Sequence, residues 1–174
     1  MRKNTKILLV RRLIFAAIIL ITHILQNSRG FVPIIFGARA FLLIPLVVCI
    51  AMFEKELAGA LLGLFAGALW DTVSGVGDGY DTLFLMLVGA ACGFLINVLM
   101  RNLLLTAIIL SLFSCLIYTG TYLVFFVVAE GVDSSGYLFL RYYFPSCIYT
   151  TLFTPAFYLL VRGIMRRTAT QDEF

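Results

Sequence analysis

The side chains that could act as nucleophiles, bases or metal ligands are few in this sequence. It contains one histidine, His23, which stands alone in an apolar stretch. The four cysteines also fall in apolar stretches, and none has the Cys-x-x-Cys spacing of a redox or metal site. They are Cys49, Cys92, Cys115 and Cys147. We therefore expect packed side chains at these positions, with no metal and no cofactor.

One short string matches a catalytic motif. Gly75-Val76-Gly77-Asp78 spells the G-x-G-D of intramembrane aspartyl proteases. Such an enzyme needs two aspartates that face each other from different helices, so that one holds a proton while the other is ionised. The near companion Asp81 follows three residues later in the same turn. The sequence therefore predicts no enzyme.

The composition is that of a membrane protein. The 174 residues are 62% hydrophobic and 13% charged, with a mean hydropathy of +1.05. A soluble domain has about 25% charged and roughly 45–50% apolar residues. A span needs about 20 residues, so six spans leave no connection near the ~50 residues of the smallest ordinary domain. This predicts an all-α polytopic protein in which residues 1–174 form a single membrane domain. A soluble catalytic domain, a large ectodomain and a nucleic-acid-binding module are excluded.

Six apolar runs, each bounded by charged or turn residues, are the predicted transmembrane helices. They cover residues 13–26, 38–53, 57–73, 81–99, 103–128 and 143–161. Five spans are the alternative, if the first or the second run lies in the membrane interface. Pro155 lies within the sixth run and predicts a kink there.

The positions of lysine and arginine predict the orientation. With the N- and C-termini both cytoplasmic, ten of the 13 Lys and Arg residues face inward, as the positive-inside rule requires. The other three are Arg29, Arg39 and Arg141. The net charge of +4 is then a signature of the inner leaflet of the lipid bilayer, and no nucleic acid is needed to explain it.

Glycines recur at helical spacing in the third and fourth runs. Gly59, Gly63 and Gly67 lie four residues apart and share one face of the third helix. Gly89 and Gly93 repeat the spacing in the fourth helix. A face without side chains lets a second helix approach closely. The spacing leaves two uses open: packing of the protein's own helices, or docking of a partner's helix.

Asp71 lies near the outer end of the third helix, next to Trp70. A carboxylate at this depth needs a partner, a cap or water. Arg39 and Arg141 precede the second and sixth runs on the same side, so we expect a structural ion pair of Asp71 with one of them. A solvated acid and a transport or proton-relay role are the alternatives. On the inner side, residues 54–56 predict a short solvated turn, with docking to a cytoplasmic partner as the alternative.

The glycine and aspartate pattern resembles the core of the MreD family, the bacterial rod shape-determining membrane proteins. The matching residues are Gly59, Gly63, Gly67, Asp71, Ser74, Gly75 and Gly79, followed by Gly89 and Gly93. The last helix also resembles that of the family. It carries Pro155, Tyr158, Leu159, Leu160 and Arg162 before a final Arg166-Arg167 pair. The motifs cover about residues 55–100 and 150–167, and the rest of the chain agrees in hydropathy.

The resemblance implies a non-enzymatic scaffold of the cell-elongation machinery, which helps to control cell shape and peptidoglycan synthesis. It implies a multi-pass protein of the bacterial cytoplasmic (inner) membrane. The implied main partner is MreC, with MreB, RodA and RodA's partner transpeptidase as further partners and a homo-oligomer as a further option. The family's fold is similar to that of the substrate-binding component of energy-coupling-factor vitamin transporters, so such a component is the alternative function. Those components often dock through an Ala-x-x-x-Ala helix, which residues 15–20 do not contain.

Overall fold

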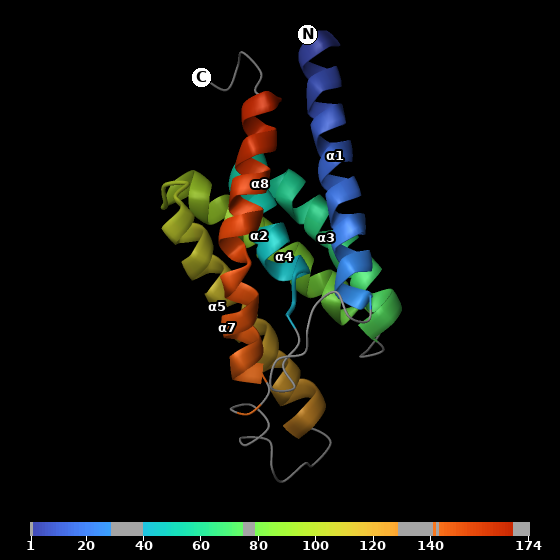
Figure 1. The fold of residues 1–174 in the computed structure, drawn as a ribbon, viewed down its shortest axis with the longest axis vertical. Coiled ribbons are helices and arrows are strands. Elements are labelled where there is room, and N and C mark those ends of the chain that lie inside the picture. The colour runs from blue at the N-terminus through green and yellow to red at the C-terminus, as the bar shows by residue number, and fades with distance from the viewer. Residues whose placement is uncertain (1, 29–39, 75–78, 129–140, 142, 169–174) are drawn as a thin grey trace.

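Helices form all the regular structure in the part of the chain that can be described. The computed structural model describes residues 2–28, 40–74, 79–128, 141 and 143–168, and these ranges contain no strand. The elements, in chain order, are α1 (Arg2–Asn27), α2 (Leu43–Glu54), α3 (Glu56–Ser74), α4 (Tyr80–Val98), α5 (Leu104–Tyr122), the π-helix η1 (Leu123–Val128) that continues α5, α7 (Phe144–Leu152) and α8 (Thr154–Arg167). Figure 1 shows them as a bundle with α2 in its middle.

Five helical stretches of the described chain are long and apolar enough to cross a membrane. They are Lys6–Asn27, Glu56–Ser74, Tyr80–Val98, Leu104–Phe125 and Phe144–Arg167. Each overlaps one of the six predicted runs. The first differs most, because α1 is already helical from Arg2, well before the predicted start at residue 13.

The predicted second span, 38–53, is the exception. Its helix, α2, has 12 residues and rises about 18 Å, whereas the hydrocarbon core is about 30 Å thick. Every residue of α2 except Phe53 is buried. A helix that is apolar on all sides packs inside a protein, and α2 contacts α1, α3, α4, α5, α7 and α8. By itself α2 is too short to cross, so the count of six spans stays a prediction.

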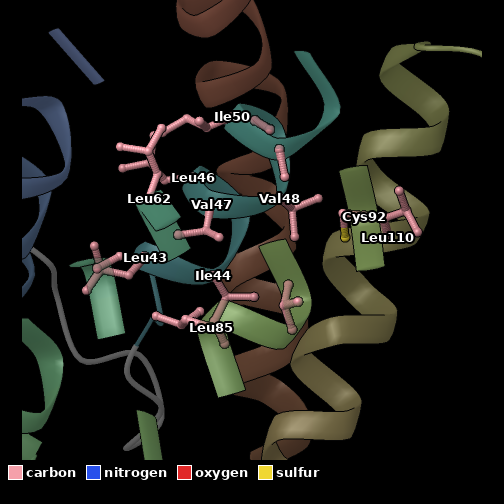
Figure 2. Packing of buried hydrophobic residues seen from close by; sticks show 14 of the residues in the cluster. Leu43, Ile44, Leu46, Val47, Val48, Ile50, Leu62, Leu85, Cys92 and Leu110 are labelled. Atoms are coloured by element: carbon pink, nitrogen blue, oxygen red, sulfur yellow. The ribbon is translucent and has the colours of Figure 1, made fainter. Parts of the chain in front are cut away.

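The core forms around α2. Figure 2 shows the side chains of α2 next to Leu62 of α3, Leu85 and Cys92 of α4, and Leu110 of α5. All of these residues are buried. Because α2 fills the space between the longer helices, their inward faces meet protein rather than lipid.

The sixth predicted run contains the expected break. Between α7 and α8 the chain turns at Phe153, whose backbone N–H donates to the carbonyl oxygen of Thr150 at 3.1 Å. Pro155 has no N–H with which to continue the helical ladder back into α7. The predicted kink near Pro155 is therefore confirmed.

One end of the bundle holds both terminal helix ends. Figure 1 shows the N-terminal end of α1 and the C-terminal end of α8 at the top. The turn between α2 and α3 lies toward this end, because Glu54 pairs with Arg11 of α1. The end of α4 reaches the same turn, because the Asn97 amide donates to Glu56 at 3.0 Å. We call this the termini end of the bundle.

Candidate functional site

The candidate site is the hairpin of α3 and α4, which is the most extensive helix pair in the described chain. The five predicted glycines are all buried in it. They are Gly59, Gly63, Gly67, Gly89 and Gly93. On α3, a Cβ atom added to Gly59 would lie 2.8 Å from the carbonyl oxygen of Gly89 on α4. Real Cβ atoms essentially never come within 3.0 Å of another atom, so the two backbones touch here without side chains between them.

The other glycines repeat this contact along the hairpin. A Cβ atom at Gly63 would overlap the carbonyl group of Leu85, and one at Gly93 would lie 2.8 Å from the Cα atom of Glu56. The glycine faces of α3 and α4 are thus turned toward each other. Of the two uses that the spacing left open, packing of the protein's own helices describes this arrangement, and a partner's helix would have to lie on another face.

The outward faces of the hairpin are apolar and exposed. On α3 the exposed residues include Leu57, Leu61 and Leu64, and on α4 they include Leu83, Leu87 and Phe94. They follow helical spacing, so each helix presents one outward stripe. In a membrane these stripes contact acyl chains or another helix.

Asp71 connects the two helices at the other end of the hairpin. Its carboxylate accepts the backbone N–H groups of Asp81 and Thr82, each at 3.0 Å, and the hydroxyl of Thr82. The ion pair expected for Asp71 is not formed with Arg141, which is described and exposed. Arg39 lies outside the described residues. Backbone N–H groups at the start of α4 are the donors to Asp71, in place of the predicted arginine.

Asp81 is fully buried next to this cap. The hydroxyl of Tyr118 on α5 donates to its Oδ1 atom at 2.9 Å. The ring of Tyr118 stacks on Trp70 and meets Phe84 edge to face. This cluster is not among the sites that the sequence predicts; the available signal is an acidic residue in the first turn of α4.

The carboxylates of Asp71 and Asp81 come from different helices, and each accepts hydrogen bonds that hold the helices together. Three hydrogen bonds hold Asp71, and Tyr118 holds Asp81. The string Gly75-Val76-Gly77-Asp78 lies outside the described residues. The described hydrogen bonds therefore explain a fixed helix junction.

The turn at residues 54–56 is not the solvated loop that the sequence predicts. Glu54 is 5% exposed and forms an ion pair with Arg11, which is 3% exposed. Only Lys55 of the turn is exposed, and its φ of 70° turns the chain sharply from α2 into α3. For Glu54 the prediction was wrong, because its partner Arg11 lies on α1, far away in sequence.

The remaining candidates for chemistry are cysteines and His23, and the side chains of Cys115 on α5 and Cys147 on α7 contact each other. The four cysteines are buried and form no disulfide. His23 is partly exposed, and the Asn27 amide lies 3.4 Å from its ring. Within the described ranges, no three His, Cys, Asp or Glu side chains come together in a way that could hold a metal ion.

One protein-family model matches nearly the whole chain. The family model described as rod shape-determining protein MreD matches residues 5–168. No curated protein matches the chain, and no solved structure does.

Proposed function

Since the chain belongs to the MreD family of rod shape-determining proteins, we propose that it is a scaffold that binds the single membrane-spanning helix of MreC. The family is one of structural, shape-determining proteins and is not a known enzyme family. The observation that carries the proposal is the hairpin itself: two helices locked by backbone contact, with apolar stripes facing outward.

The proposed location is the bacterial cytoplasmic membrane, with both termini in the cytoplasm. Six passes would put both termini on one side, and the ends of α1 and α8 lie together at the termini end. In this topology α2 is the short pass. Because α2 is buried, the unpaired backbone N–H and C=O groups at its ends can bond to protein groups and need not face lipid.

The partner's helix would lie against an outward stripe of the hairpin. Lipid tails are as apolar as leucine, so helices associate in a membrane by van der Waals packing and a few polar contacts. A hairpin that keeps its shape loses little conformational entropy when a partner binds, which favours association. MreB, RodA with its partner transpeptidase, and a second copy of this chain are further proposed partners.

Photo-crosslinking in living cells tests the proposal. A photoactivatable residue at Leu64 or Leu87 probes the two stripes, and one at Phe113 on α5 is the matched control; all three side chains are exposed. We expect an adduct with MreC from Leu64 or Leu87 and none from Phe113. Gly63 and Leu85 are unsuitable, because both lie inside the hairpin.

Two results would contradict the proposal. An MreC adduct from Phe113 alone would move the interface away from the hairpin. A vitamin bound tightly to the purified protein would favour the alternative function, the substrate-binding component of an energy-coupling-factor transporter.

A further inference from the structure

Three elements meet at a polar junction at the termini end of the bundle. The side-chain amide of Asn102, just before α5, donates to the carbonyl oxygen of Met52 in α2 at 3.1 Å. The hydroxyl of Tyr158 in α8 donates to the carbonyl oxygen of Asn102 at 3.2 Å. The end of α2, the start of α5 and the middle of α8 are therefore held side by side.

Four exposed cations lie close in sequence to the residues of this junction. They are Lys55, Arg101, Arg162 and Arg166, which we call the basic surface. Lys55 and Arg101 lie within three residues of the junction in sequence, and Arg162 and Arg166 follow Tyr158 at four-residue steps along one side of α8. None of the four forms an ion pair with a described residue.

The described acids at this end do not neutralise the basic surface. Glu54 is buried and already paired with Arg11, and its other oxygen lies 3.6 Å from the Nε atom of Arg12. Glu56 accepts a hydrogen bond from the neutral Asn97 amide and keeps its negative charge, which offsets the charge of the neighbouring Lys55. The charges of the three arginines remain. The basic surface therefore keeps a positive charge that can attract an anion.

Exposed leucines flank these cations. Leu99 and Leu103 lie on either side of Arg101 and are 70% and 55% exposed. Leu159 and Leu160 precede Arg162 and are 60% and 42% exposed. In a membrane these leucines contact acyl chains, so an anion bound at the basic surface also lies beside acyl chains. A molecule with a phosphate headgroup and acyl chains matches both features.

We propose that the basic surface binds the phosphate of an anionic phospholipid, whose acyl chains lie along the neighbouring leucines. This inference needs only the membrane location and does not rest on binding of MreC. Each Lys or Arg near an anionic membrane surface contributes about 1 kcal/mol, which is about a fivefold change in affinity.

Native mass spectrometry of the full chain in neutral detergent tests this inference. The protein is titrated with phosphatidylglycerol or with phosphatidylcholine that has the same acyl chains. We expect phosphatidylglycerol to bind more tightly, and R162Q and R101Q each to weaken its binding about fivefold. R141Q is the matched control: it removes one exposed arginine at the start of α7, away from the termini end, and should leave the affinity unchanged.

Three results would overturn the inference. Equal affinity for the two lipids would show that the headgroup charge is not recognised. Equal weakening by R141Q and R162Q would show that overall charge, and not this surface, attracts the lipid. Displacement of the lipid by inorganic phosphate at a similar concentration would assign the surface to a soluble anion. R101Q lies outside any helix, so it tests the surface even if R162Q fails to fold.

Discussion

Asp71 on α3 caps the first turn of α4 through Thr82, whose backbone N–H lies 3.0 Å from the Asp71 carboxylate and whose hydroxyl donates to the same oxygen. The other carboxylate oxygen accepts the N–H of Asp81. Donors in a first helical turn have no acceptor within their own helix, and the helix dipole favours a negative charge there. A side chain of α3 thus supplies the hydrogen-bond acceptors that the first turn of α4 lacks.

Replacement of Asp71 with Asn should destabilise the protein without preventing its insertion. Asn has one acceptor oxygen, and its NH₂ group would face an N–H donor. We expect a loss of about 1–2 kcal/mol in the free energy of unfolding, measured by denaturation in detergent. The control is Thr72→Val, which removes an exposed hydroxyl that bonds only within α3. Equal stability of the two variants would contradict the capping role.

Gly63→Ala should weaken the hairpin by about 1–3 kcal/mol, since the new methyl group would overlap the backbone of Leu85. Backbone of a packed helix cannot move aside as a flexible side chain can. The control is Gly163→Ala in α8, where an added Cβ atom meets nothing within 4 Å. We expect that variant to be unchanged or stabilised by up to about 1 kcal/mol. Similar unfolding midpoints for both variants would argue against close backbone contact.

The sequence predicts the helical class and six apolar runs, five of which overlap helices of crossing length, because long apolar runs are easily identified. It did not predict that α2 would be a short buried helix. Hydropathy measures how apolar a segment is, and it cannot distinguish a helix covered by protein from one covered by lipid. The glycine spacing likewise predicted which face of α3 lacks side chains, whereas the neighbour that fills it became known only from the structure.

The polar residues were harder to predict, because their partners are distant in sequence. The sequence predicts an arginine partner for Asp71, whereas its hydrogen-bond donors are backbone N–H groups on α4. The sequence predicts a solvent-exposed Glu54, whereas Glu54 forms an ion pair with Arg11 on α1. Charge counting treats every ionised residue as solvated, so a buried pair between helices leaves no signal in the sequence.

Glu54→Gln should cost about 3–5 kcal/mol of stability, because it removes the negative charge that Glu54 places against the buried guanidinium of Arg11. Replacement of both residues with apolar ones, as in R11M/E54L, should recover much of this loss. Glu56→Gln is the control, since it keeps an acceptor for Asn97 at a partly exposed position. The test is a double-mutant cycle of unfolding free energies. Additive effects of the single substitutions would mean that the pair does not couple α1 to α2.

Tyr118→Phe removes one hydroxyl and keeps the ring that packs on Trp70 and Phe84. The buried Asp81 carboxylate then loses the donor at 2.9 Å. We expect a loss of about 1–3 kcal/mol in the free energy of unfolding, the cost of an unsatisfied buried polar group.

Tyr149→Phe on α7 is the matched control for this prediction, because the Tyr149 ring contacts Phe153 and its hydroxyl has no hydrogen bond among the described residues. Adding Asp81→Asn to Tyr118→Phe should restore part of the stability, since a neutral amide is less costly to bury than a carboxylate. If the two tyrosine variants unfold at the same denaturant concentration, Asp81 must obtain a donor from elsewhere, and the link between α4 and α5 would rest on ring packing and on the hydrogen bonds of the Tyr80 hydroxyl to Tyr118 and Thr121.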